Sequence, residues 1–393
     1  MTNSTTTLAQ HKIPFFVPTI GEDEINEVVD TLRSGWLTTG KKAKRFEEEF
    51  AERVGAKHAI AVNSCTAALH LALEALGVSP GDEVIVPTLT FASTAEVVAH
   101  LGATPVLADC RPDTLNVDPE SIAAKITPKT KAIVPVHYAG QPCDMDAIHS
   151  LAAEHGLPVV EDAAHALPAR YGERTVGSIS DITCFSFYAN KTITTGEGGI
   201  VTTDSDDLAA RMRIMSLHGI SKDAWKRFSA EGSWYYEITA AGFKHNMTDL
   251  AAAIGLHQLS KCDEFWEGRS RCADYYDRVF ADVPEVQTPT VAPGNQISWH
   301  LYVIQLQLDQ LTIDRNEFIS RLTAAGVGTS VHYMPLHMHP YYRETHGYQP
   351  DDLPVAKAAF ERMISLPIYP KLSEDDLRYV VGTVRGIVAE TRQ

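Results

Sequence analysis

Apolar residues in the first half of the chain alternate between helical and strand-like spacing. The first helical spacing, from Ile25 to Leu32, is followed by Ser34-Gly35, which predicts a helix that ends in a turn. A second helix is expected over 43–54. The expected strands are 58–62, 83–86, 104–108, 131–136 and 157–161, with helices starting at Thr66, Ser93, Asp118, Asp144 and Asp206. Strands separated by amphipathic helices predict a mainly parallel sheet sandwiched by helices, with ligands at the strands' carboxyl ends.

The pattern changes after a long helical stretch at about 247–280, which we interpret as a connector. Beyond it we expect a strand over 300–307, a helix over 315–325 and a last helix over 373–390. Ser373 followed three residues later by Asp376 is close to a capping box. We therefore predict a large domain over 1–260, including an N-terminal arm, and a smaller C-terminal α+β domain over 261–393.

Composition narrows the class of protein. The chain has 393 residues, 44% of them hydrophobic and 21% charged, and at roughly 100 to 200 residues per domain this length suggests two closely packed domains. The formal net charge of −16 leaves no broad basic surface for a nucleic acid. No apolar stretch approaches the roughly 18 residues of a membrane span, and 1–12 has no apolar signal core. We expect a cytoplasmic protein that binds neither nucleic acid nor membrane.

Neither the cysteines nor the histidines form a metal motif. The six cysteines are far apart and contain no C-x-x-C pair, so buried reduced thiols are expected. His332, His337 and His339 lack the H-E-x-x-H spacing and have no cysteine partner, and we expect no metal. The chain also has no G-x-G-x-x-G or P-loop motif, which leaves nicotinamide and NTPase functions without support.

Lys191 is the first candidate catalytic residue. It lies between an apolar strand that begins at Phe185 and the glycine-rich turn 196–199. Most lysines are solvated surface charges, but these neighbours favour a side chain that projects inward. Partial burial there would lower the pKa of the amine and make it a nucleophile.

Asp162 and His165 follow an apolar strand at its carboxyl end. An aspartate at this place often only caps the next helix. Alternatively, an ionised Asp162 pairs with a protonated pyridine nitrogen while His165 donates to a ring oxygen. A lysine that binds a cofactor covalently, together with an aspartate for the pyridinium, is typical of pyridoxal phosphate enzymes.

A phosphate site is predicted where the first strand turns into a helix, at Asn63-Ser-Cys-Thr66. Helix N-termini bind phosphate through free N–H groups and the helix dipole, although small residues also begin many ordinary helices. Cys65 and Thr66 lie in this turn, and Ser186 can add a hydroxyl. Phe91 follows a strand at its ligand-facing end and can stack on the pyridine ring or belong to the core.

Four motifs together resemble the DegT/StrS-type sugar aminotransferases, a pyridoxal phosphate family of the aspartate aminotransferase fold (fold type I). They are Ser64-Cys-Thr-Ala-Ala, Glu161-Asp-Ala-Ala-His-Ala, Phe185-Ser-Phe-x-x-x-Lys191 and Glu197-Gly-Gly. The resemblance runs nearly end to end and includes the segments 34–40, 135–140, 242–253 and 365–370. Within the family, the chain is most similar to the branch that aminates a UDP-4-keto-pentose to UDP-4-amino-4-deoxy-L-arabinose. Cys65, Phe91 and Tyr188 differ from that branch, which leaves the sugar open.

The resemblance implies a role for each matched residue. Lys191 binds the cofactor, Asp162 and His165 contact its ring, Cys65, Thr66 and Ser186 hold its phosphate, and Phe91 stacks on it. The family further implies a homodimer with shared sites, in which Lys244 and Asn246 reach the neighbour's cofactor. Trp36, Thr38, His332 and His337 are expected near the sugar nucleotide, although a solvated loop explains them equally well.

The implied activity is a ping-pong transamination from glutamate to the keto carbon, C4 in our prediction, of a nucleotide-linked keto-sugar, with UDP as the expected carrier. In related dehydratases a histidine replaces the lysine, so Lys191 favours transamination. A dehydratase or lyase on the same scaffold, and a non-catalytic regulator that retained the fold, are the alternatives. The product's destination stays open among lipopolysaccharide, other surface polysaccharides, glycoproteins and antibiotics.

Overall fold

The computed structural model describes residues 12–220 and 235–393. Its helices are α1 (Glu22–Ser34), α2 (Lys41–Val54), α3 (Cys65–Ala75), α4 (Ser93–His100), α5 (Pro119–Ala123), α6 (Met145–His155), α7 (Asp206–Met215), α8 (Asp249–Ser260), α9 (Cys262–Phe280), α10 (Arg315–Ala324), α11 (Pro340–His346), α12 (Pro354–Arg362) and α13 (Glu374–Thr391). Three short 3-10 helices are η1 (Tyr138–Gly140), η3 (Leu308–Gln310) and η4 (Leu336–Met338). The strands are β1 (His58–Val62), β2 (Glu83–Pro87), β3 (Thr104–Ala108), β4 (Thr130–Ile133), β5 (Val160–Asp162), β6 (Arg170–Tyr171), β7 (Arg174–Thr175), β8 (Ile182–Ser186), β9 (Gly199–Thr203), β10 (Val286–Gln287), β11 (Tyr302–Leu306) and β12 (Met363–Leu366).

The large central sheet consists of two sets of strands, β1-β9-β8-β5 and β3-β2-β4. Parallel bridges from Ile133 to Val159 and from Val136 to Asp162 join the two sets, so that β4 lies beside β5. Only β9 runs antiparallel to its neighbours in these sets. The prediction of a mainly parallel sheet is therefore confirmed.

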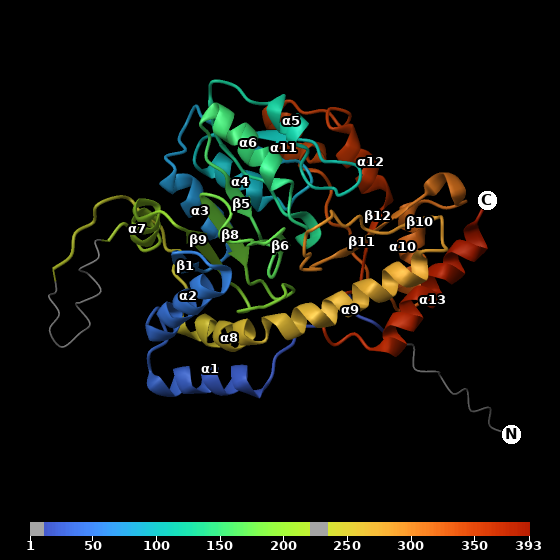
Figure 1. The fold of residues 1–393 in the computed structure, drawn as a ribbon, viewed down its shortest axis with the longest axis horizontal. Coiled ribbons are helices and arrows are strands. Elements are labelled where there is room, and N and C mark those ends of the chain that lie inside the picture. Colours follow the sequence, from blue (N-terminus) through green and yellow to red (C-terminus); the bar gives the residue numbers. More distant parts are fainter. Residues whose placement is uncertain (1–11, 221–234) are drawn as a thin grey trace.

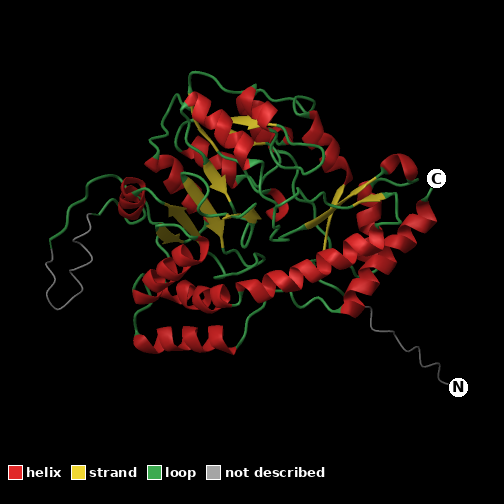
Figure 2. Ribbon diagram, in the orientation of Figure 1, coloured by secondary structure: helices red, strands yellow, loops and turns green. Residues whose placement is uncertain are grey.

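Helices cover both faces of this sheet (Figures 1 and 2). Ile60 and Val62 of β1 pack in the cluster that contains the buried residues of α3, α4 and α7. Ala59 and Ala61 of the same strand pack on the opposite face with Phe46 and residues of α2 and α8. The alternation of side chains along each strand thus feeds two cores, as expected for a strand buried on both sides.

A second sheet, β10-β11-β12, is antiparallel and packs with α9, α10 and α13 around a separate apolar cluster. Figure 1 shows α9 running from the end of α8 to this sheet. The structure divides the predicted connector into two helices, because Lys261, with φ −98° and ψ 4°, ends α8 and precedes α9. The predicted domain division at 260/261 falls at this break, and it stays a prediction.

Local signals explain several helix ends. Gly35 adopts φ 76° in the left-handed region and ends α1, as the Ser34-Gly35 pair predicts. Ser373 and Asp376 form the predicted capping box of α13. Ser64 accepts a hydrogen bond from the Ala67 amide and so caps α3.

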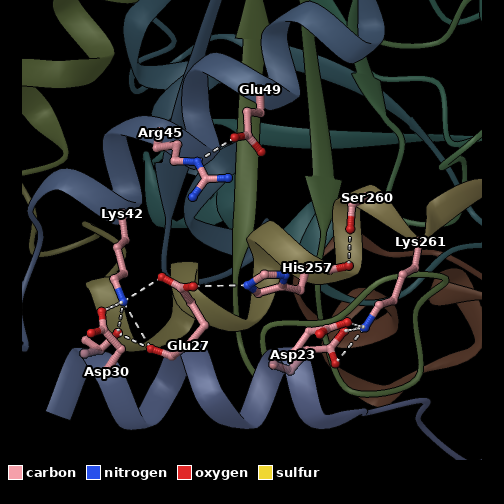
Figure 3. Close-up of polar contacts among 11 residues, drawn as sticks. Asp23, Glu27, Asp30, Lys42, Arg45, Glu49, His257, Ser260 and Lys261 are labelled. Carbon is pink, nitrogen blue, oxygen red and sulfur yellow. Dashed lines mark hydrogen bonds and ion pairs between the residues drawn. The ribbon is translucent and has the colours of Figure 1, made fainter. Parts of the chain in front are cut away.

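Ion pairs attach α1 to the rest of the large domain (Figure 3). Glu27 of α1 contacts Lys42 Nζ at 2.7 Å and His257 Nε2 at 3.1 Å, and Asp30 contacts the same lysine at 2.7 Å. Lys261 Nζ lies 2.8 Å from the Asp23 carboxylate. The polar face of α1 is therefore turned toward α2 and α8. Ile25 and Leu32 are 47% and 54% exposed.

Within the described residues, no helix is long and apolar enough to cross a membrane. The same part of the chain holds no group of three or more histidine, cysteine or acidic residues placed for a metal ion. All six cysteines are buried and unpaired, which confirms the expectation of buried thiols.

Candidate active site

The carboxyl ends of β5 and β8 bring the two principal candidates together. Asp162 is the last residue of β5, and Lys191 lies in the turn between β8 and β9. The pKa of Lys191 is lowered to about 8, chiefly by burial and also by the nearby Arg269 charge, while Asp162 opposes the shift. The neutral, nucleophilic amine is then a minor form at pH 7 and reaches about half of the molecules near pH 8.

Asp162 is 4% exposed, and its two oxygens accept hydrogen bonds from Thr94 Oγ1 at 2.8 Å and from the Ala164 amide at 3.1 Å. Burial raises the pKa of this carboxyl, although both hydrogen bonds and the Lys191 charge oppose the shift. A protonated nitrogen that faced this buried carboxyl would stabilise its ionised form.

Two neutral imidazoles flank Lys191. His300 Nε2 lies 3.3 Å from Lys191 Nζ, and the His165 ring lies 4.3 Å from the His300 ring, centroid to centroid. Burial holds the pKa of both histidines well below its usual range, and the Lys191 charge acts in the same direction. His165 Nε2 contacts Tyr333 Oη at 3.1 Å, whereas His165 Nδ1 and His300 Nδ1 are buried without a partner. Unpaired buried nitrogens are rare, and a polar ligand that bonds them would explain both.

The predicted phosphate end is built from β9 and the start of α3. A Cβ on Gly199 would lie 2.6 Å from the Ser64 carbonyl atoms and 2.7 Å from the Cys65 amide nitrogen, so only glycine permits this close approach. The Cys65 side chain is buried and its thiol points to the Cys184 carbonyl oxygen at 3.8 Å. Cys65 can therefore contribute only its amide N–H. Thr66 is half-buried, and Ser186 Oγ accepts from the Tyr188 amide at 3.3 Å.

These residues fit pyridoxal phosphate. The orphaned His165 nitrogen, the buried Asp162 carboxyl, the Lys191 amine with its lowered pKa and the helix N-terminus match the ring, the aldehyde and the phosphate of that cofactor. Phe91 is 60% exposed, and its ring lies 6.0 Å from the ring of Tyr333, the residue that contacts His165. Its exposed face is free to stack on an aromatic ligand.

A second group of predicted residues lies beside Asn63, close to the start of α3. Lys244 Nζ donates to Asn246 Oδ1 at 2.6 Å, and Asn246 Nδ2 donates to Thr39 Oγ1 at 2.6 Å. Asn63, which immediately precedes the phosphate turn, donates to the Lys244 carbonyl at 3.2 Å. Trp36 is 42% exposed and its indole N–H donates to the Thr39 carbonyl, and Thr38 is also exposed. These four predicted residues thus form one partly exposed cluster.

The histidines expected at the sugar nucleotide are separated in the structure. His332 is half-buried, bonds Ser365 Oγ through Nδ1 at 2.8 Å and stacks on Phe15. His337 has no exposed surface, and its ring nitrogens contact Thr88 Oγ1 and the Pro350 carbonyl. A substrate cannot reach His337 in this arrangement, so the structure does not bring it to the site that we expected, and it supports Thr88 instead.

Four residues of the site are absent from the sequence-based prediction: Thr94, Arg269, His300 and Tyr333. Tyr333 follows the predicted His332 directly, and Thr94 lies in the helix expected to start at Ser93. Neither spacing nor composition marks His300 or Arg269, because both reach Lys191 from segments that are distant in the sequence.

Comparisons with known proteins place this geometry in context. The model of the DegT/DnrJ/EryC1/StrS aminotransferase family matches residues 18–385. The spore coat polysaccharide biosynthesis protein SpsC of Bacillus subtilis (strain 168) is 52% identical over 379 residues, which cover 96% of this chain and 97% of SpsC.

Two solved structures are similar over almost their whole length. Spr1654 from Streptococcus pneumoniae, in its PLP-form, has a TM-score of 0.90 and 36% identity, and the match covers 97% of this chain and 99% of that one. PseC of Helicobacter pylori, an aminotransferase involved in the biosynthesis of pseudoaminic acid, has a TM-score of 0.90 and 30% identity, with 97% and 100% covered.

Proposed function

The chain belongs to the DegT/DnrJ/EryC1/StrS aminotransferase family, and on this premise we propose that it transfers the amino group of glutamate to C4 of a UDP-linked keto-sugar. It is a sugar aminotransferase with the aspartate aminotransferase fold, and its cofactor is pyridoxal phosphate. The observation that carries the proposal is the Lys191 amine, which burial keeps partly deprotonated beside the Asp162 carboxyl. A dehydratase of this family would have a histidine in place of that lysine.

The chain's residues would hold the cofactor by its phosphate and by its ring. The amides of Cys65 and Thr66, with the Ser186 hydroxyl, bind its phosphate at the start of α3. Asp162 binds the ring nitrogen, His165 the ring oxygen, and Phe91 the ring face. When bound, pyridoxal phosphate supplies an aldehyde that accepts the amino group and a protonated ring that takes up the electrons of a broken C–H bond.

Lys191 moves the proton in each half-reaction. Once Lys191 Nζ is free, it would remove the proton from the α-carbon of the donor. It would then give this proton to the carbon bonded to the other side of the transferred nitrogen. A pKa of about 8 suits both tasks, because the group then exchanges a proton readily near neutral pH. In the second half-reaction Lys191 Nζ would deliver a proton to the former keto carbon of the sugar.

The relatives support a sugar as the substrate, and the proposed identity of that sugar rests on the matched segments. The name of SpsC refers to polysaccharide biosynthesis, and PseC is involved in the biosynthesis of pseudoaminic acid. We infer a keto-sugar carried on a nucleotide, of the UDP-4-keto-pentose kind, with Trp36, Thr38 and His332 beside it. The product then enters a surface polysaccharide.

We also infer a homodimer with shared sites. Leu32 and Ile254, with Val28 and Leu250, line a surface cavity of ≈ 530 Å³ that also includes Asn63 and Asn246. The apolar face of α1 and α8 therefore continues into the segment that precedes the phosphate turn. A second copy that covers this face would bring its own Lys244 and Asn246 close to the neighbour's cofactor.

The experiment is an amino-transfer assay with glutamate and a panel of UDP-4-keto-pentose, UDP-4-keto-6-deoxyhexose and a 3-keto nucleotide sugar. Mass spectrometry of the sugar product and quantification of 2-oxoglutarate are the measurements. We expect one equivalent of 2-oxoglutarate per amino-sugar, with the 4-keto-pentose preferred. Loss of a hydroxyl without 2-oxoglutarate would favour the dehydratase, and amination of only the 3-keto sugar would refute the C4 assignment.

A further inference from the structure

Arg269 is a buried cation without an acidic partner in the described part of the chain. The residue lies on α9 and is 3% exposed. Its Nη1 donates to the carbonyl oxygens of Trp299 and His300, each at 3.2 Å, and of Ile368 at 3.0 Å. Its Nη2 donates to the Asn190 carbonyl at 3.3 Å. Buried charges are normally paired with an opposite charge, so four backbone carbonyls around one guanidinium need an explanation.

These carbonyls come from three segments that are far apart in the sequence and that all contact Arg269. Asn190 immediately precedes Lys191, Trp299 and His300 lead into β11, and Ile368 follows β12. Trp299 adopts φ 54°, in the left-handed region that residues other than glycine rarely occupy. Two successive carbonyls thereby reach the same nitrogen of Arg269.

The packing of α9 on the segment after β12 is correspondingly close. A Cβ on Gly268 would lie 2.9 Å from Pro370 Cα, so a side chain there would separate the two segments. Tyr276 Oη, two turns further along α9, donates to the Pro367 carbonyl at 2.8 Å. The Ser365–Pro370 motif, which the proposed reaction itself does not use, thus docks α9 and brings Arg269 to Lys191.

Arg269 holds the backbone on both sides of the contact between Lys191 and His300. One of its carbonyl partners belongs to the residue before Lys191, and another belongs to His300 itself. The side chains of Lys191 and His300 are in contact, with 3.3 Å between Lys191 Nζ and His300 Nε2. Because His300 is neutral, its Nε2 can accept a hydrogen bond from the amine when the ring proton is on Nδ1.

We propose that Arg269 is a positioning residue for Lys191, whose guanidinium fixes His300 and the Lys191 backbone relative to each other and so holds the free amine against the His300 imidazole. The amine is free whenever it is not bonded to the cofactor, which occurs once in each half-reaction. The proposal rests on the role of Lys191 in amino transfer but not on the identity of the sugar.

Among residues 12–220 and 235–393, the charges that face Lys191 come from two elements. Asp162 of β5 raises the pKa of the amine, and Arg269 of α9 lowers it. The other titratable groups nearby are uncharged at neutral pH: burial raises the pKa of the Cys65 thiol well above its usual range and lowers the pKa of the imidazoles of His165, His300 and His332. Removal of the Arg269 charge therefore raises the pKa of Lys191.

The test follows the bond between Lys191 and the cofactor in the full-length chain. Protein freed of cofactor is mixed with pyridoxal phosphate, and the absorbance of the Lys191 adduct is recorded by stopped flow across a pH series. The variants are Arg269→Lys, Arg269→Gln, His300→Phe and the double variant Arg269→Lys/His300→Phe. Arg271→Gln is the matched control, because Arg271 lies on the same helix, is exposed and donates to one carbonyl, that of Pro370.

We expect the wild-type rate to rise with pH through about 8, the pKa to which burial lowers Lys191. Arg269→Lys keeps a charge but cannot span four carbonyls, so the limiting rate falls about ten- to a hundredfold while the midpoint stays. Arg269→Gln lowers the rate and also moves the midpoint to higher pH. Arg271→Gln behaves as the wild type.

The double variant separates positioning from general damage to the fold. If Arg269 acts through His300, the double variant is no slower than the slower single variant. Losses that multiply in the double variant would overturn the proposal, as would a wild-type rate in Arg269→Lys. If Arg269→Gln does not fold, as judged by circular dichroism, the lysine and double variants still decide the question. None of these rates requires a sugar substrate, so a wrong sugar assignment leaves the test intact.

Discussion

Asp162 depends on its neighbours for its charge. Burial raises the pKa of the carboxyl, and Thr94 opposes the shift by donating its only hydroxyl proton. Thr90 Oγ1 lies 2.8 Å from Thr94 Oγ1 and must donate to it, because the Thr94 proton is already engaged. A chain of two buried hydroxyls thus points its hydrogen bonds at the carboxyl. We propose that a protonated cofactor ring completes the ionised state.

Asp162→Asn should lower the rate of the glutamate half-reaction at least about a hundredfold, because a neutral amide does not keep the ring nitrogen protonated. The decay of cofactor absorbance after addition of glutamate measures this rate. Asp109→Asn is a control, since Asp109 is a nearly buried carboxyl that caps α12 through the amides of Val355 and Ala356. Equal rates in Asp162→Asn and the wild type would remove Asp162 from the site.

Lys191 should lower the stability of the cofactor-free protein at neutral pH. Burial depresses its pKa to about 8 in the folded chain, whereas an unfolded lysine titrates near 10.4. Below pH 8 the folded state must bury a charge, and this penalty disappears as the pH rises from 8 toward 10.4. Lys191→Met should therefore raise the free energy of unfolding by about 1 to 3 kcal/mol at pH 7.

Urea unfolding of the two cofactor-free proteins at pH 7 and at pH 10 provides the measurement. The stability difference should shrink at the higher pH, because the wild-type amine is then neutral. A difference that is independent of pH would show that packing, and not the buried charge, is responsible.

At the scale of elements, the phosphate site depends on how closely β9 passes the start of α3. Gly199→Ala places a Cβ within 2.7 Å of the Ser64 and Cys65 backbone, and overpacking of this kind typically costs about 1 to 3 kcal/mol. The variant should be less stable and should bind pyridoxal phosphate more weakly, as measured by fluorescence titration. Gly386→Ala is the control in α13, where no atom lies within 4 Å and alanine favours the helix. Unchanged cofactor affinity in Gly199→Ala would contradict the assignment of the phosphate to this turn.

The exposed apolar face of α1 and α8 carries the dimer proposal. Leu32→Glu puts a charge on this face without disturbing the ion pairs of α1 with Lys42 and Lys261. We expect the dimer of this variant to dissociate at a higher protein concentration than the wild-type dimer, as measured by light scattering over a concentration series. Val291→Glu is the matched control, because Val291 is 43% exposed on a loop elsewhere. A monomeric wild type at all concentrations would refute the shared site.

Periodicity and caps were sufficient to predict most elements around the large sheet. The bounds of β1 and β3 agree with the prediction, because their apolar runs are bordered by clear turn residues. The division of the predicted connector at Lys261 was missed, since neither glycine nor proline marks it. β10 has two residues, too few for a period to be visible in the sequence.

At the scale of the whole molecule, the site combines segments that are far apart in the sequence. Lys191, Asp162 and the start of α3 could be predicted because each belongs to a local motif at the end of a strand. His300, Tyr333 and Arg269 could not, since they reach the site only through the packing of β11, β12 and α9 against the large sheet. His337, which the segments matched to the family had suggested as a contact of the sugar nucleotide, is fully buried, and the sequence alone did not reveal this burial.

We propose that one cofactor on Lys191 takes an amino group from glutamate and gives it to a UDP-4-keto sugar. The most direct test is the visible absorbance spectrum of the purified protein, recorded before and after glutamate and again after the keto-sugar. We predict that glutamate bleaches the yellow form and that the keto-sugar restores it, which would demonstrate both half-reactions in one sample. Bleaching that the sugar does not reverse would contradict the proposed substrate, and a protein that takes up no pyridoxal phosphate would contradict the account as a whole.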